Sequence, residues 1–557
     1  MNTLLQDVKY GLRMLRRSPG FTAVAVLTLA LGIGVNTGIF SLAEAVLFPR
    51  FAGAHSSRLA AIYTSGIHRT GYSSSSYPDY VDYREHSRAF SGIAAFVRVE
   101  AAWTHGKTTD LPWAEVVSSN YFDVLGVKPF KGRFFLPTEN RTAGSAPVVV
   151  VSYRFWRTHM ESTPAPGGRA LMLNGRLFTV AGVAPKDFEG VQLNWGHPPD
   201  FWLPMSAEKT FLHRAGLLSE RQARWCLMVG RLAPGVTLAK AGSEIRLMAE
   251  QLERAYPQAD EGRTAFVLPF DQGRIWPTWR EKISGTLWLL ELFAGLVLLV
   301  ACADVANLLL ARGVSRQKEI SVRLALGSGR LRIVRQMFTE SLLVSLAGAG
   351  VGLLLAQWLV RWAMTFRQLF TIQLDRLPAA LDGRVLAFAA SLAILTALAS
   401  GLLPSLRVSR LDLNASLKQS GAQSSAAGRH QQLRGWLTVA EVAVAFIAMA
   451  GAGMLLRTLW TLDSTDLGLN PRHVLSASTE VYTRGFKTAE GIRFYSEMLS
   501  RIRALPGVRS AALALDSPLT TMHLWKPVEK VDGESPNPEA WKTVEGNVVS
   551  MATAGDA

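Results

Sequence analysis

Cysteine is nearly absent from this sequence, which has only Cys226 and Cys302 among 557 residues. One falls in a candidate outer domain and the other in an apolar run, so no disulfide framework is predicted. Motifs for nucleotide, metal or acyl chemistry are missing too: there is no G-x-x-x-x-G-K-[ST] loop, H-E-x-x-H pair, Cys/His ligand spacing or G-x-S-x-G turn. We therefore predict no catalytic, cofactor-binding or metal-binding residue, and a chain that is not itself an enzyme.

Long uncharged runs are what the sequence does contain. Hydrophobic residues make up 49% of the chain, and the mean hydropathy is positive. Five runs reach the roughly 20 apolar residues that a membrane-spanning helix needs. They cover 21–48, about 283–311, 341–360, 385–406 and 435–460. These runs predict a membrane protein with an α-helical bundle of about five transmembrane helices and one or more large α+β extracytoplasmic domains.

The first run could also be a secretory signal peptide, because Arg16 and Arg17 precede it. Its apolar stretch exceeds the 7–15 residues typical of a signal peptide, so we interpret it as an uncleaved anchor. Before it, apolar residues such as Leu4 and Val8 recur on one helical face while Lys9 lies on another. Residues 1–20 are thus predicted to form an amphipathic helix in the cytoplasmic interface.

Basic residues give the orientation. The chain carries a net charge of +16, and Lys and Arg concentrate in 1–20, in 311–336 and in the linker 407–434. By the positive-inside rule these segments are cytoplasmic, as is the N-terminus. The same topology puts 49–282 and 461–557 outside.

The segment 49–282 has the pattern of a folded α+β domain. The stretch 171–185 predicts a hairpin that turns at Asn174-Gly175, where a positive φ is needed. Thr237 opens a helix whose apolar residues, from Leu238 to Leu252, repeat at spacings of three and four.

An internal repeat links the two outer segments. "YPDYVDYREHSRAFSGIAAF" (77–96) and "GIRFYSEMLSRIRALPGVRSAALA" (491–514) both predict a helix, a turn and a strand, and each follows an apolar anchor. The second half stops inside its outer domain, so we interpret 461–557 as the start of an incomplete second core domain and the chain as C-terminally truncated. A natural five-helix chain is the alternative.

Several motifs resemble the FtsX-like permeases of ABC transporters that carry a MacB-type periplasmic core. They are Val149 to Ser152 with Trp156, "NGRLFTVAGVAPKDFEG" (174–190), "DFWLP" (200–204), "GRLAPGV" (230–236), and Glu319, Ile320, Arg323, Ala325 and Gly327. The stretch "VKYGLRMLRRSPGFTAVAVLTLALGIGVNTGIFS" (8–41) is similar to the duplicated-permease (ADOP) subgroup. That subgroup has three further helices, which this sequence lacks. The resemblance implies a MacB-type core at 49–282, an FtsX-like three-helix unit at 283–406 and a second anchor at 435–460.

The basic loop 311–336 could contact lipid, nucleic acid or a protein. The positive-inside rule already accounts for the basic charge of this loop, so the charge gives no support to nucleic-acid binding. Ile320 and Leu324 lie one turn apart, and the glycines at 327 and 329 then break the helix. A short amphipathic helix of this kind suits a protein groove. By resemblance the groove belongs to a separate, dimeric ABC ATPase, and the coupling residues are Arg316, Glu319, Ile320, Arg323, Leu324 and Gly327.

Small residues and acids within the apolar runs give further candidates. Gly34 with Gly38, and Gly348 with Gly352, have the small-xxx-small spacing that lets membrane helices approach closely. Glu291, Asp304 and Glu441 are acids in apolar runs, where charge is costly and often functional. A structural role is favoured for Asp304, and both readings stay open for Glu291 and Glu441.

The family resemblance implies a bacterial inner-membrane permease that transmits ATP-driven motion to its periplasmic domains for export or efflux. Its implied partners are the ATPase, membrane lipids, and a periplasmic adaptor or outer-membrane channel. Two rivals stay open: a scaffold that activates an extracytoplasmic enzyme such as a cell-wall hydrolase, and a lipoprotein-extraction permease.

Overall fold

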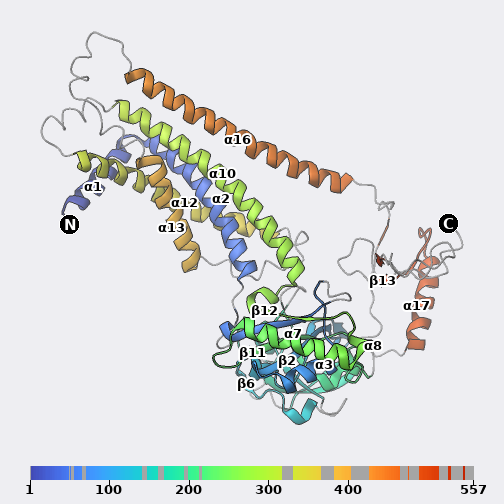
Figure 1. The fold of residues 1–557 in the computed structure, drawn as a ribbon. Helices are drawn as coiled ribbons and strands as arrows, with labels where there is room; N and C mark the ends of the chain where they lie inside the picture. The colour runs from blue at the N-terminus through green and yellow to red at the C-terminus, as the bar shows by residue number, and fades with distance from the viewer. Residues whose placement is uncertain are drawn as a thin grey trace, which may run out of the picture.

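The structure of the chain is a computed structural model. It describes residues 2–48, 51, 56–65, 71–140, 147–160, 168–192, 198–212, 216–315, 330–365, 382–402, 426–464, 474–475, 488–513, 525–527 and 543–545. Within these residues it consists of a bundle of long helices and an α+β domain at one end of the bundle (Figure 1).

Five helices in the described part of the chain are long and apolar enough to span a membrane. They are α2 (Pro19–Leu47), α10 (Pro277–Ser315), α12 (Arg330–Thr365), α13 (Gly383–Ala397, continued by the π-turn Leu398–Leu402) and α16 (Ala426–Ser464). The helix α1 (Asn2–Arg17) precedes α2 and lies at the end of the bundle away from the outer domain (Figure 1). The predicted five-helix membrane architecture is confirmed.

Three helices extend by several residues beyond their apolar runs, and one of them, α12, begins at Arg330, inside the predicted basic loop 311–336. The helix α10 begins at Pro277, before the apolar run, because proline is well suited to the first turn of a helix. The helix α16 begins at Ala426, inside the segment 407–434 that the sequence analysis assigned to a linker. Its first turns contain Ala, Gln and Leu, which favour a helix without being apolar enough to mark a membrane span.

A twelve-stranded sheet forms the centre of the outer domain, in the order β12-β1-β11-β2-β5-β10-β7-β9-β8-β3-β4, with β6 pairing β9. The pairs β10–β5 and β7–β9 are parallel, and the others are antiparallel. The strands are β1 (Leu59–Thr64), β2 (Phe90–Glu100), β3 (Trp103–His105), β4 (Thr108–Asp110), β5 (Trp113–Val117), β6 (Lys131–Gly132), β7 (Val148–Val151), β8 (Ala170–Leu173), β9 (Arg176–Val183), β10 (Phe201–Pro204), β11 (Leu227–Leu232) and β12 (Ala265–Pro269).

Both faces of this sheet are covered. On one face α3 (Tyr77–His86), α5 (Tyr153–His159) and α7 (Leu238–Ala255) pack their apolar side chains, including Tyr80, Phe155 and Ile245, in one core cluster. On the other, α4 (Tyr121–Leu125) and α9 (Phe270–Gly273) contribute to a second cluster around Trp202. Short helices α6 (Glu208–Phe211) and α8 (Pro257–Asp260) lie in the connections.

The local predictions for the outer domain are confirmed where the structure describes them. The hairpin of β8 and β9 turns at Asn174 and Gly175, whose φ values are 46° and 72°. The Thr237 hydroxyl caps α7 by accepting a hydrogen bond from the backbone N–H of Lys240. The helix–turn–strand pattern of 77–96 is α3 followed by β2.

The prediction of the same helix–turn–strand pattern at 491–514 is only partly correct. Its helix is α17 (Thr488–Arg503), but residues 508–513 form no strand. A strand is stable only with a hydrogen-bonded neighbour, and β2 has both β5 and β11 beside it. No described strand pairs with 508–513, and the later strands β13 (Trp525–Pro527) and β14 (Thr543–Glu545) pair with each other.

Candidate functional site: a helix bundle joined to the outer domain

The closest backbone approach in the bundle is between α2 and α12, and three of the four glycines singled out in the sequence lie there in tight contact. A Cβ atom added to Gly34 would lie 2.8 Å from the carbonyl oxygen of Gly352, and one added to Gly348 would lie 2.9 Å from the Leu29 Cβ. Gly38 faces Ala356 across the same interface at an ordinary contact distance. Larger residues at Gly34 or Gly352 would therefore separate the two helices.

A buried amide joins α2 to α10. The Asn36 side chain is 3% exposed, and its Nδ2 donates to the carbonyl oxygens of Gly32 in its own helix and of Ala294 in α10, each at 2.8 Å. An amide in an apolar run must find such partners, because no water competes there. The helices α2, α10 and α12 therefore form one packed unit.

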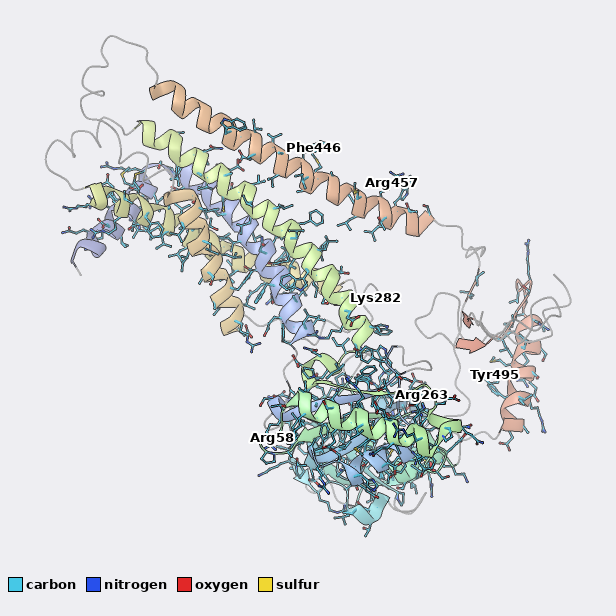
Figure 2. All side chains as sticks on the ribbon, viewed as in Figure 1. Arg58, Arg263, Lys282, Phe446, Arg457 and Tyr495 are labelled. Carbon is cyan, nitrogen blue, oxygen red and sulfur yellow. The ribbon has the colours of Figure 1, made fainter. Side chains whose placement is uncertain are left out.

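The three intramembrane acids lie on α10 and α16. Asn307 of α10 donates from Nδ2 to the Glu441 carboxylate of α16 at 3.2 Å, and Asp304 lies beside the same carboxyl group. Glu291 lies farther toward the outer domain in α10. The outward side of α16 is open, and Phe446 is 68% exposed (Figure 2). The structure thus brings Asp304 and Glu441 together and leaves Glu291 apart.

At the end of the bundle away from the outer domain, α1 packs on the start of α12. The Arg335 Nε donates to the Asp7 carboxylate at 2.8 Å, and Gly11 lies against Leu343. The predicted coupling residues Arg316, Glu319, Ile320, Arg323, Leu324 and Gly327 lie outside the described residues. The described chain resumes at 330, so α1 contacts the helix that leaves this loop.

At the opposite end, α2 and α10 meet just outside the outer domain. Val46, Leu47 and Ile275 form a small buried cluster with Trp279 packed against it. The Arg280 side chain donates to the Leu47 carbonyl oxygen at 3.3 Å. Two residues farther, the exposed Lys282 lies on the same helix (Figure 2).

Arg274 lies between α9 and α10, inside this junction, and is 2% exposed. Its Nε donates to the Val191 carbonyl oxygen at 3.0 Å. Its guanidinium lies 5.4 Å from the Phe51 ring centroid and 5.7 Å from that of Phe270. Burial lowers the pKa of Arg274 to about 10, against the attraction of nearby acids that include Glu115, so the group stays charged at neutral pH.

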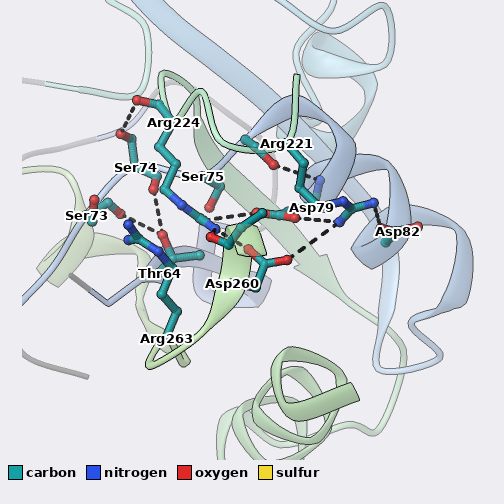
Figure 3. A network of polar contacts seen from close by, with 12 residues as sticks. Thr64, Ser73, Ser74, Ser75, Asp79, Asp82, Arg221, Arg224, Asp260 and Arg263 are labelled. Carbon is teal, nitrogen blue, oxygen red and sulfur yellow. Dashed lines mark hydrogen bonds and ion pairs between the residues drawn. The ribbon is translucent and has the colours of Figure 1, made fainter. Parts of the chain in front are cut away.

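A buried ionic network fixes the outer domain on the side of α3 and α8 (Figure 3). Arg221 bonds Asp79 at 2.6 Å and Asp82 at 2.7 Å, and Arg224 bonds Asp79 at 3.0 Å and also bonds Asp260. Burial raises the pKa of Asp260, the Asp79 charge adds to the rise, and Arg224 opposes it. Buried charges of this kind need every partner they have.

Sequence reasoning missed Arg274 and this network. Their members are ordinary charged residues scattered from 79 to 274, with no motif spacing. Asn36 carried a weak signal, as a polar residue within an apolar run. Among the residues that the structure describes, no three His, Cys, Asp or Glu side chains gather as a metal site would require.

Two family models match the chain. A MacB-like periplasmic core domain covers residues 22–247, and an FtsX-like permease C-terminal domain covers residues 291–413. The first match begins in α2 and ends in α7, and the second begins in α10. Both resemblances inferred from the sequence motifs are confirmed.

Curated relatives agree with these matches. The chain is 28% identical over 289 residues to the macrolide export ATP-binding/permease protein MacB of Nitrosomonas europaea, which is 51% of this chain and 39% of that protein. It is 28% identical over 243 residues to the MacB of Sodalis glossinidius, 43% of this chain and 34% of that one. The match thus spans well under half the length of these two relatives.

Among solved structures, the chain matches the periplasmic region of MacB from Actinobacillus actinomycetemcomitans at 15% identity and a TM-score of 0.30, covering 41% of this chain and 94% of that one. The extracellular domain of the noncanonic ABC-type transporter YknZ from Gram-positive bacteria matches at 12% identity and a TM-score of 0.29, covering 37% of this chain and 99% of that one.

Proposed function

We propose that this chain is a MacB-type ABC transporter permease that couples ATP hydrolysis by a separate ATPase to movement of its outer domain, as both of its matched domains support. Its relatives are named for an ATP-binding part as well as a permease part, and the segment matched here is permease-like. The ATPase dimer would therefore be another chain, bound at the cytoplasmic loop 311–336.

One observation carries the proposal. The helix α12 follows the basic loop and packs along α2, where Gly34 lies against Gly352. The helix α2 is in turn joined to α10 by the hydrogen bond of Asn36. The last residues of α2 and the first residues of α10 both lie at the outer domain. A tilt of α12 imposed from the cytoplasm would thus move three packed helices together, because tightly packed interfaces transmit displacement rather than absorb it.

Transport would follow from this motion, with substrate taken from the periplasm or the outer leaflet and exported. An outer domain that moves needs no channel through the bundle. Leu29 and Val344 belong to a buried apolar cluster inside the described bundle, which supports this view. A periplasmic adaptor or outer-membrane channel would receive the substrate.

The coupling loop gives the direct test. Leu324→Asp buries a carboxylate in the proposed ATPase groove at a cost of several kcal/mol, which abolishes a modest interface. Reversal of the charges at Arg330 and Arg332 is the matched control, since these lie beyond the glycine break. The measurement is a pull-down of the ATPase encoded beside this chain, in detergent. We expect the first variant to lose binding and the second to keep it.

Equal loss for both variants, restored by adding positive charge elsewhere in the loop, would mean that bulk charge makes the contact. No binding by the wild-type chain would count against the proposed function itself. Membrane insertion of each variant is checked first by sedimentation with membranes.

We further propose an inner-membrane protein with a cytoplasmic N-terminus and periplasmic outer domains. Cysteines engineered near Asn174, for example at the exposed Leu177, and near Ala540 should react with an impermeant maleimide from outside, and those near Ser328 and Ser425 only after lysis. The native Cys226 is fully buried, and Cys302 is replaced by alanine for this experiment. Outside labelling of position 425 would contradict the five-helix topology.

A further inference from the structure

Arg274 contacts three segments that are distant in the sequence. Phe51 lies just beyond the end of α2, Val191 follows β9, and Phe270 opens α9. Arg274 itself lies three residues before α10 begins. One side chain thus touches the exit of α2, the entry to α10 and a loop of the outer domain.

The contacts are directional as well as close. The Nε–H donates along the line to the Val191 carbonyl, and the guanidinium is within cation–π distance of both rings. Phe51 and Phe270 also pack edge-to-face, with centroids 4.9 Å apart. A planar group held by a hydrogen bond and two rings has little freedom to turn.

A fully buried carboxylate helps to hold this arrangement. Glu115 of β5 is 0% exposed, and it accepts hydrogen bonds from the Tyr121 hydroxyl at 2.8 Å and the Trp202 indole N–H at 2.9 Å. Glu189 makes the largest electrostatic attraction to Arg274 and Glu115 a smaller one, while burial raises the pKa of Glu115 itself. Acidic groups of the outer domain therefore favour the charged guanidinium inside the junction.

We propose that Arg274 is the positioning residue that fixes the angle between the outer domain and the helices α2 and α10. With Arg274 in place, a displacement of the two helices turns the outer domain as one body. Without it, the short connection at 274–276 acts as a hinge, and helix motion is lost there. The inference rests on the proposed function for its purpose, but the rigidity it predicts is a property of the chain alone.

Rigidity can be measured directly. Nitroxide labels at Leu247 on α7 and Leu299 on α10, both exposed, report the angle between the domain and the helix. The full chain in lipid nanodiscs, with Cys302→Ala and no ATPase or nucleotide, is compared with Arg274→Met and Arg274→Lys by double electron–electron resonance. We expect a single narrow distance peak for the parent and loss of that peak for both variants, because lysine lacks the planar fork.

Arg231→Met is the matched control. Arg231 also donates from Nε to a backbone carbonyl, that of Val124 at 2.8 Å, but within the outer domain and away from the junction. Its distance peak should stay narrow. Tryptophan-fluorescence melts accompany each variant, so that only folded samples are compared, and Arg274→Lys decides the matter if Arg274→Met does not fold.

A narrow peak retained in folded Arg274→Lys or Arg274→Met would overturn the inference. Failure of the proposed function looks different: the parent would keep its narrow peak, but the peak would not move when ATP is added to the complex with its ATPase. If the proposed function and the role of Arg274 are both correct, ATP shifts the distance peak in the parent. The Arg274→Lys variant then hydrolyses ATP without a matching shift.

Discussion

Asn36 in α2 and Ala294 in α10 are joined by a hydrogen bond of 2.8 Å from the Asn36 Nδ2 to the Ala294 carbonyl oxygen. The same nitrogen bonds Gly32 in its own helix, so one amide serves two helices. Polar contacts of this kind supply specificity to membrane helices, which gain little from apolar burial against lipid.

Replacement of Asn36 by leucine should loosen the α2–α10 pair. We expect the free energy of unfolding in detergent to fall by about 1 kcal/mol, the usual worth of such a bond. Thr37→Val is the control, because the Thr37 hydroxyl bonds only Ile33 of its own helix. Thermal melts of the two variants are compared, and an equal loss would mean that Asn36 contributes no bond between helices.

The glycine interface predicts effects of opposite sign for two alanine substitutions. Gly34→Ala places a methyl group against the Gly352 carbonyl and should destabilise the bundle by roughly 1–3 kcal/mol. Gly350→Ala has nothing within 4 Å and should be neutral or stabilising, since alanine favours a helix. The same melts in detergent measure both. Similar effects at the two positions would argue against close packing of α2 on α12.

The ionic network of the outer domain should be sensitive to loss of one member. Arg224→Met leaves Asp79 and Asp260 buried with fewer partners and should cost about 3–5 kcal/mol of stability. Glu85→Gln removes an exposed pair with Arg84 and should change stability by less than about 1 kcal/mol. Chemical unfolding followed by tryptophan fluorescence provides both values. A small loss for Arg224→Met would show that water reaches the network.

Acid should weaken the attachment of α7. Burial alone would raise the pKa of Glu244, but hydrogen bonds from the Ser87 hydroxyl and the backbone N–H groups of Ala89 and Arg88 outweigh it and lower the pKa. A lowered folded-state pKa means that Glu244 stabilises the fold above the ordinary glutamate value of about 4.3 and loses this effect as the pH falls through the folded-state value.

The test is a series of thermal melts from neutral to acid pH. Glu244→Gln should be less stable than the parent at pH 7 and should show a shallower decline on acidification. Asp123→Asn, on the exposed side of α4, should decline in parallel with the parent. Parallel curves for the parent and Glu244→Gln would refute the assignment.

Much of the fold follows from local sequence. Apolar runs gave the spanning helices, three-and-four spacing gave α7, and Asn174-Gly175 gave the hairpin. Sheet order did not follow, because β5 pairs in parallel with β10 across 83 intervening residues and nothing local encodes that choice. The spacing of Gly34 and Gly38 predicts a close helix contact but not that α12 supplies it.

The junction was the least predictable part. Residues 51, 191 and 274 come together only after the whole outer domain has folded, so no window of the sequence contains the contact. An arginine before a transmembrane helix is also common, so the sequence does not distinguish Arg274 from the other charged residues that flank the helices. Its burial, rather than its type or spacing, distinguishes it.

The bond between Asn36 and Ala294 also bears on how the chain is made. Its two residues are 258 apart in the sequence, with the entire outer domain between them. At the usual 5–20 residues per second, synthesis needs roughly 10–50 s to reach Ala294 after Asn36 has been added. During that time α2 occupies the bilayer without α10, and its amide has only the Gly32 carbonyl of its own helix to bond. In the topology proposed above, the second bond of Asn36 can form only after the outer domain has crossed the membrane.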